Sequence, residues 1–150
     1  MGAPLAGSAE QVTDFRRRLL DGLAASIQER GYRETTVSDI VRAHGTERAD
    51  QVALIQGDRR VTWGQLLARS GQVANLFAAA GVGNQDRVAF LDKNGIEHFE
   101  VFYGAALLNA VCVDVNWRLA PPEVEYIVND AEAKVLVVGP DFVPVLDAIR

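Results

Sequence analysis

The stretch of residues 94–139 constrains the fold of this chain more than any other. It reads NGIEHFEVFYGAALLNAVCVDVNWRLAPPEVEYIVNDAEAKVLVVG, with helix, strand, helix and strand signals in close succession. Strands that alternate with helices of roughly 10–15 residues form right-handed βαβ units and a parallel sheet. The sequence therefore predicts an α/β fold.

A β-hairpin is predicted upstream of this stretch. Residues 52–55 and 60–63 are short β-type runs, and they are joined around Gly57 and Asp58. Such a pair is typical of tight hairpin turns because glycine adopts a positive φ without steric cost. The same part of the chain contains Gly81-Val82-Gly83. We interpret it as a helix stop and a turn, because it lacks the Lys-Ser/Thr ending of a phosphate-binding loop.

Strand and helix boundaries follow from apolar runs and capping residues. The expected parallel strands are residues 87–91, 110–115 and 134–138. The last run is apolar throughout, so we expect it to be buried on both faces. Helix starts are predicted at Thr36, Thr62, Asn94 and Pro121. The helix after Asn94 is expected to bury Phe99, Phe102, Tyr103, Ala106 and Leu107.

Composition narrows the class of protein. The chain has 150 residues, of which 49% are hydrophobic, enough for a real core. Its single cysteine, Cys112, excludes an intrachain disulfide and suits a reducing compartment. The longest apolar run, residues 101–113, is shorter than the roughly 18–20 residues that span a bilayer. We therefore expect a cytoplasmic protein with no transmembrane segment.

Charge is unevenly distributed along the chain. Residues 1–43 carry six arginines and six acidic residues, whereas residues 44–150 carry nine basic and fourteen acidic residues. The second part should therefore repel nucleic acid and anionic membranes.

Two segments together resemble a known enzyme family. DQVALIQGDRRVTWGQL at residues 50–66, and residues 81–138, which begin GVGNQDRVAF, are similar to the amino-terminal end of adenylate-forming acyl-CoA synthetases. The similarity is closest to fatty-acid–CoA ligases of the bacterial type. It implies ATP-dependent conversion of a small-molecule carboxylic acid to an acyl-adenylate, from which the CoA thiol displaces AMP. ATP, Mg²⁺ and CoA are thus implied for the full-length family.

The resemblance also implies which parts of that chemistry this chain lacks. The family's glycine-rich lysine loop, its Mg²⁺ carboxylate, its ribose aspartate and its mobile lysine all come after position 150 in family order. None has a match in this sequence. We therefore expect a truncated synthetase that binds no cofactor and is inactive by itself. The expected fold is a β-hairpin followed by a partial parallel βαβ sheet, with a separate N-terminal helical segment.

That N-terminal segment resembles a different family. FRRRLLDGLAASIQERGYRETTVSDIVRAHG, residues 15–45, is similar to the start of a TetR-type transcriptional regulator. The resemblance implies a partial helix-turn-helix with Thr36 and Arg42 as candidate DNA contacts. The recognition helix is missing, because the sequence continues as TERADQVALIQGDRR. We interpret the chain as a chimera, with a TetR-like segment at 1–43 and a partial synthetase domain at 44–150.

Few residues stand out as candidates for chemistry. Asn116 and Arg118 follow the carboxyl end of a predicted strand, where open α/β sheets bind ligands, so they are candidates for lining the substrate cleft. Otherwise they fix the loop before Pro121. Cys112 is interpreted as a buried thiol without a nearby base. The two histidines lie far apart in the sequence without cysteine partners, so we predict no metal site.

Three functional readings remain open. We favour a truncated acyl-CoA synthetase. A TetR-type DNA-binding regulator is an alternative, against which the missing recognition helix and the acidic second part argue. A non-catalytic interaction fragment is the other alternative. Apolar surface left uncovered in such a fragment would promote self-association.

Overall fold

The computed structural model describes residues 36–149. Helices and strands follow one another there in the order that the sequence predicts. The strands are β1 (Val52–Gln56), β2 (Arg59–Thr62), β3 (Arg87–Leu91), β4 (Val111–Asp114) and β5 (Val135–Val138). The helices are α2 (Val37–Glu47), α3 (Trp63–Ala79), α4 (Ile96–Leu107), α5 (Pro121–Asp130), the 3-10 turn η1 (Pro140–Phe142) and α6 (Val143–Ala148).

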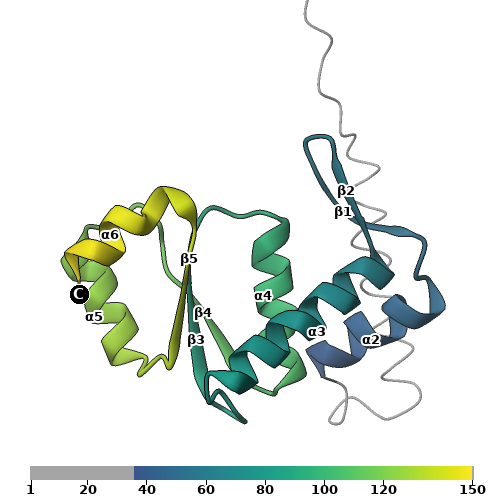
Figure 1. Cartoon of the computed structure of the whole chain (residues 1–150), viewed down its shortest axis with the longest axis horizontal. Coiled ribbons are helices and arrows are strands. Elements are labelled where there is room, and N and C mark those ends of the chain that lie inside the picture. Colours follow the sequence, from purple (N-terminus) through teal and green to yellow (C-terminus); the bar gives the residue numbers. More distant parts are fainter. Residues whose placement is uncertain (1–35, 150) are drawn as a thin grey trace, which may run out of the picture.

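Three strands form a parallel sheet in the order β4-β3-β5 (Figure 1). β3 is central: Phe90 pairs with Asp114 of β4, and Leu91 pairs with Val138 of β5. Helix α4 connects β3 to β4, and α5 connects β4 to β5. The predicted hairpin and partial parallel βαβ sheet are therefore confirmed.

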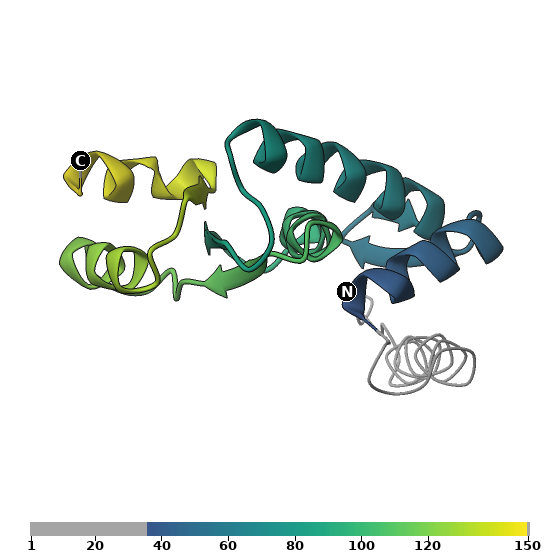
Figure 2. The same ribbon diagram turned by 90° about the horizontal axis from the view of Figure 1, so that it is seen from below.

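Side chains of β3 alternate between two apolar layers. Val88 and Phe90 pack with residues of α3 and α4, such as Phe77 and Val101. Ala89 and Leu91 belong to a second cluster, which also contains Val124 of α5, Phe142 of η1 and partly buried residues of α6. Figure 2 shows α3 and α4 on one side of the sheet and α5 and α6 on the other. Because strand side chains alternate with a period of two, β3 has apolar side chains on both faces of the sheet, and helices cover each face.

The prediction that β5 is buried on both faces was wrong. All four of its residues are only partly buried. In β3, by contrast, the four residues after Arg87 are buried. Within the described residues β5 pairs on one side only, whereas β3 has a neighbour on each side. Apolar runs alone do not distinguish an edge strand from a central one.

The hairpin packs into a second core beside the sheet. Gly57 has φ 58° at its turn, which confirms the predicted glycine-dependent turn. Ala53 of β1 joins Val41 of α2, Trp63 of α3 and Tyr103 of α4 in one buried cluster. The hairpin is therefore anchored by three helices (Figure 1).

Helix starts follow the predicted caps in three of four cases. The backbone NH of Thr36 donates to Asp39, and Thr62 and Gln65 cap each other reciprocally. Pro121 begins α5. The prediction for Asn94 was wrong, because α4 begins at Ile96 and its N-cap is Gly95, which is in extended conformation.

The buried face of α4 also differs from the prediction. Phe102 remains 38% exposed, whereas Glu100 is buried. Arg69 of α3 compensates the buried carboxylate, since its Nε donates to Oε1 of Glu100 at 2.5 Å. The face turned toward α3 thus includes a charge that periodicity of apolar residues cannot reveal.

Helix length bears on membrane insertion. A helix needs about 20 predominantly apolar residues to cross a bilayer. Among residues 36–149, no helix is long and apolar enough to do so.

Gly104 sets how closely α4 approaches α3. A Cβ at this position would lie 2.7 Å from Cγ1 of Val73 and 3.2 Å from the carbonyl oxygen of Ser70. Gly104→Ala should therefore lower the free energy of unfolding by about 1–2 kcal/mol, because overpacking outweighs the gain in helix propensity. Gly71 in α3 is the matched control, since a Cβ there would meet nothing within 4 Å. Gly71→Ala should stabilise by about 0.5–1 kcal/mol, and equal urea midpoints for the two variants would contradict this interpretation.

Asp86 should contribute pH-dependent stability. Its carboxylate accepts from Nζ of Lys134 at 2.8 Å and from the NH of Gly83 at 2.7 Å, and the Lys134 hydrogen bond is the main cause that lowers the pKa of Asp86. A lowered folded pKa gives stability that is full above the unfolded pKa and is lost as pH falls through the folded value. Asp86→Asn should therefore lower Tm at neutral pH and reduce the loss of Tm toward about pH 3.

The control for this measurement is Asp130→Asn, which alters an exposed carboxylate on α5. We expect it to leave both the neutral Tm and the acid limb close to those of the unaltered chain. Melting curves followed by circular dichroism at a series of pH values make the comparison. An Asp86→Asn curve parallel to the unaltered one at every pH would show that the Lys134 pair contributes nothing.

Candidate functional site

The carboxyl ends of the three parallel strands meet at one edge of the sheet. β3 leads into Asp92 and Lys93, β4 into residues 115–120, and β5 into Gly139. In open α/β sheets, ligands bind in the crevice outside these strand ends. This edge is therefore the candidate functional site.

Asn116 and Arg118 lie together in the loop after β4. The backbone NH of Arg118 donates to Oδ1 of Asn116 at 3.1 Å, and both residues are exposed. The Arg118 guanidinium lies over the ring of Trp117, with its Cζ 4.0 Å from the ring centroid. Stacking on an indole orients a guanidinium while leaving its donors available to a ligand. Their role in a substrate cleft stays a prediction.

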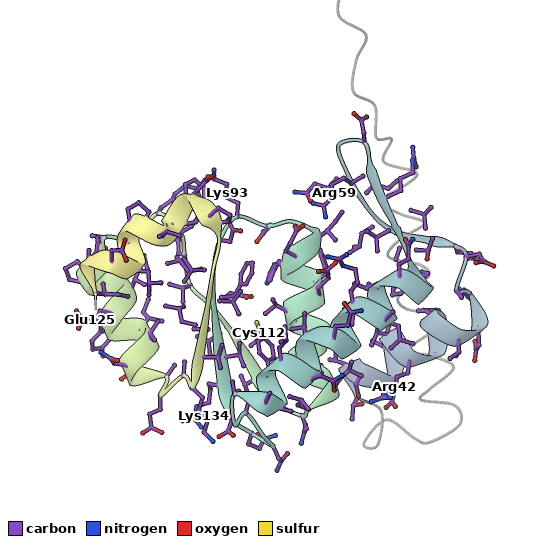
Figure 3. The ribbon with its side chains drawn as sticks, in the orientation of Figure 1. Arg42, Arg59, Lys93, Cys112, Glu125 and Lys134 are labelled. Atoms are coloured by element: carbon purple, nitrogen blue, oxygen red, sulfur yellow. The ribbon has the colours of Figure 1, made fainter. Side chains whose placement is uncertain are left out.

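The structure adds a second cation to this edge. Nζ of Lys93 lies 2.9 Å from Oδ2 of Asp141, and this carboxylate is the main cause that raises the pKa of Lys93. The same Nζ lies 5.8 Å from the Trp117 ring centroid and 5.9 Å from that of Phe142. Figure 3 shows Lys93 near the start of η1 and α6. The sequence analysis missed Lys93, although its place just after a predicted strand could have indicated it. Its partners could not be predicted, because they follow two other strands.

Glycine is required where β5 ends. A Cβ on Gly139 would lie 2.0 Å from Cγ of Asp92. The Asp92 carboxylate also accepts from the backbone NH of Lys93 at 2.7 Å, and Gly139 NH donates to the carbonyl of Leu91. The missing side chain lets the ends of β3 and β5 approach, with the Asp92 carboxylate held between them.

Three polar side chains converge near the end of β4. Nε2 of His98 lies 2.8 Å from Oδ1 of Asp114, and Sγ of Cys112 donates to the same oxygen at 3.6 Å. Burial, followed by the nearby Asp114 charge, raises the pKa of the Cys112 thiol to about 12. A thiol held protonated is a poor nucleophile, but the predicted full burial was wrong, because Cys112 is only partly buried. The expectation that Cys112 has no base nearby and that the histidines have no cysteine partner was also wrong, because α4 brings His98 back over the sheet, next to Cys112.

The other sequence candidates lie elsewhere. Thr36 and Arg42 belong to the beginning and middle of α2, beside the hairpin, and Arg42 is exposed (Figure 3). The Thr36 hydroxyl is engaged with Ser38 and Asp39. Neither residue is brought to the carboxyl edge of the sheet. A DNA contact by them stays a prediction, and residues 15–35 of the TetR-like segment lie outside the described residues.

The Gly81-Val82-Gly83 segment is a turn between α3 and β3. Gly81 has φ 82°, and Val82 is buried in the core on the α3 side. Lys134 Nζ donates to the carbonyl of Gly81 at 3.1 Å. These contacts support a helix stop and turn, as expected from the sequence.

In chemical terms, the edge presents two cations beside an indole ring. Such a set suits an anionic or planar aromatic group. Its carboxylates are a poor set for Mg²⁺, because Asp141 pairs with Lys93 and Asp92 is held by a backbone NH and packed against Gly139. We assign no Mg²⁺ ligand among the described residues.

Curated relatives of this chain are carboxylate ligases. The chain is 45% identical over 93 residues to a long-chain-fatty-acid–CoA ligase, FadD13, of Mycobacterium tuberculosis, a match that covers 62% of this chain and 18% of the relative. It is 35% identical over 104 residues to a fatty acid–[acyl-carrier-protein] ligase, ScoC, of Streptomyces coeruleorubidus. This match covers 69% of this chain and 20% of the relative. The chain thus spans about a fifth of the length of these relatives.

Solved structures share the fold. The anthranilate CoA ligase AuaEII in complex with anthranoyl-AMP matches with a TM-score of 0.74 and 34% identity over 77% of this chain and 22% of its own. A Mycobacterium tuberculosis fatty acyl CoA synthetase matches with a TM-score of 0.68 and 37% identity, and the match covers 77% of this chain and 23% of the synthetase. The family of AMP-binding enzymes matches residues 41–149, which include the hairpin, the sheet and its carboxyl edge. This chain belongs to the AMP-binding enzyme family.

Proposed function

We propose that this chain forms part of an ATP-dependent ligase that activates a fatty acid or another carboxylic acid as an acyl-CoA. The observation that carries the proposal is the agreement of sequence and fold with one enzyme, the fatty acyl CoA synthetase that is 37% identical over 77% of this chain. The 45% identical curated relative supports the fatty-acid class.

The proposed reaction has two steps. A carboxylate oxygen attacks the α-phosphorus of ATP, and pyrophosphate leaves. The CoA thiol then attacks the acyl carbon and loses its proton to solvent, and AMP leaves. Both steps develop negative charge that fixed cations and dipoles stabilise. We propose that Arg118 and Asn116 line one wall of the cleft, with the guanidinium held in place by Trp117. ATP and CoA are substrates of the whole protein in this proposal.

By itself, this chain is proposed to be inactive. No glycine-rich loop ending in a lysine and a hydroxyl residue occurs in its 150 residues. The matched region also corresponds to only about a fifth of the relatives' length. We therefore expect the chain to catalyse no carboxylate-dependent exchange of pyrophosphate into ATP. Exchange above the background without fatty acid would contradict this expectation.

A chimeric ligase tests the proposed function directly. Residues 41–149 of this chain would replace the corresponding stretch of the Mycobacterium tuberculosis long-chain-fatty-acid–CoA ligase. We expect the chimera to keep fatty-acid-dependent exchange of pyrophosphate into ATP, since the two stretches share a fold. A chimera that melts cooperatively and has a native circular dichroism spectrum, but shows no exchange, would contradict the proposal.

Arg118→Ala in this chimera tests the cleft assignment. Charge-assisted contacts contribute about 1.5–3 kcal/mol, so kcat/KM should fall roughly 10- to 100-fold. Arg60→Ala is the matched control, because Arg60 is an exposed arginine on β2 of the hairpin and not on a loop that follows a parallel strand. Equal kcat/KM for the two variants would remove Arg118 from the cleft and leave the ligase proposal standing.

The remaining sequence predictions concern the N-terminal part. The proposed boundary between residues 43 and 44 falls within α2, which packs against the hairpin and α3 through Val41. The two-part division and DNA binding stay predictions. Self-association likewise stays a prediction. Exposed apolar side chains such as Leu76 and Phe102 would drive it.

A further inference from the structure

A mixed cluster of metal-binding side chains lies beside the carboxyl edge of the sheet. His98 comes from the first turn of α4, whereas Cys112 and Asp114 come from β4. Their ligand atoms all lie within 4.8 Å of one another. Figure 3 shows Cys112 between the sheet and α4.

The fold itself places these groups on one face. Cys112 and Asp114 are two residues apart in a strand, so their side chains point the same way. Asp114 pairs with Phe90 of β3, and the His98 ring stacks on the Phe90 ring with centroids 4.7 Å apart and planes 14° from parallel. This stacking holds the imidazole beside the two β4 side chains. The cluster is thus preorganised by packing.

The spacing is close to that of a tetrahedral metal centre. Bonds of about 2.0 Å to nitrogen or oxygen and 2.3 Å to sulfur put tetrahedral ligand atoms roughly 3.3–3.7 Å apart. Oδ1 of Asp114 lies 2.8 Å from Nε2 of His98 and 3.6 Å from Sγ of Cys112. The widest pair in the cluster needs to contract by only about 1 Å to reach that range. Rotation about the Cys112 and Asp114 side-chain bonds supplies adjustments of this size.

We propose that His98, Cys112 and Asp114 form a binding site for a borderline-soft divalent cation of the Zn²⁺ class. Thiolate and imidazole favour Zn²⁺ over Mg²⁺ or Ca²⁺, which take oxygen ligands. Three protein ligands leave a fourth position for water. The Asp114 side chain is 61% exposed and that of His98 19% exposed, so the site is open to the solvent on the carboxylate side.

Binding of the cation changes which groups in the cluster carry protons. In the metal-free chain, Cys112 donates to Asp114, and a proton between His98 Nε2 and the same carboxylate completes the set. The cation takes the place of the thiol proton, which is released to solvent, and a neutral imidazole ligates through Nε2 with its own proton on Nδ1. The positive charge of the ion stabilises the thiolate that the buried surroundings alone disfavour.

The sequence makes the site easy to identify in solution. Cys112 is the single cysteine of the chain, and the other histidine, His44, is buried against Trp63 in the second core. Any metal–thiolate signal from one chain must therefore come from Cys112.

Cobalt(II) is the spectroscopic probe of choice. The full 150-residue chain, without an affinity tag and stripped with a chelator, is titrated with Co²⁺ under reducing conditions. We expect a thiolate-to-cobalt charge-transfer band that saturates at one ion per chain, and its loss when Zn²⁺ is added. Zn²⁺ should also slow alkylation of the Cys112 thiol in the unaltered chain, a readout that needs no variant.

Variants assign the other two ligands. His98→Gln and Asp114→Asn should each weaken Co²⁺ binding more than about tenfold, the lower bound even for residues that only support a ligand. Cys112→Ser should abolish the charge-transfer band. Asp130→Asn is the matched control, an exposed carboxylate on α5, and should bind Co²⁺ like the unaltered chain. Circular dichroism confirms that each variant is folded before it is titrated.

Three outcomes would overturn the proposal. One is the absence of a charge-transfer band at saturating Co²⁺. A second is unchanged affinity in a folded His98→Gln variant. The third is a band whose strength per chain rises with protein concentration, which means that two chains share the ion. None of these results bears on the ligase proposal, because the chimera experiment measures pyrophosphate exchange and not metal binding.

Discussion

Two-sided burial of β3 is the constraint on which the rest of the structure depends. Val88 and Phe90 point to the α3 and α4 layer, while Ala89 and Leu91 point to the layer of α5 and α6. A strand with apolar side chains on both faces is stable only when helices cover both. The crossover helices α4 and α5 therefore lie on opposite faces, and the strand ends that form the candidate site meet at one edge.

Helix α4 links this sheet to the hairpin. Gly104 permits its close approach to α3, and Glu100 ties it to Arg69 across the same interface. Tyr103 of α4 belongs to the core under the hairpin, whereas Val101 belongs to the core on the sheet. One helix thus couples two apolar cores, and its first turn carries His98 to the carboxyl edge. The packing of α4 against α3 and the hairpin core therefore determines where His98 lies at the carboxyl edge.

Much of the fold and part of the site follow from local signals. The hairpin turn at Gly57, the reciprocal cap at Thr62 and the start of α5 at Pro121 are visible in the sequence, since each depends on neighbouring residues. Asn116 and Arg118 could be found because they follow a strand end. The exposure of β5 and of Phe102 could not, because an apolar residue's burial depends on which elements lie beside it.

By itself, the sequence determined the order of the elements and the α/β class, because periodicity, caps and turn residues act over a few positions. The family resemblance came from the segments at residues 50–66 and 81–138 taken together. Only the tertiary structure decided which side chains share a site. Lys93, Trp117 and Asp141 come from three strand ends, and His98 meets Cys112 and Asp114 across a helix and a strand. These encounters depend on strand register and on the path of α4, which local patterns do not encode.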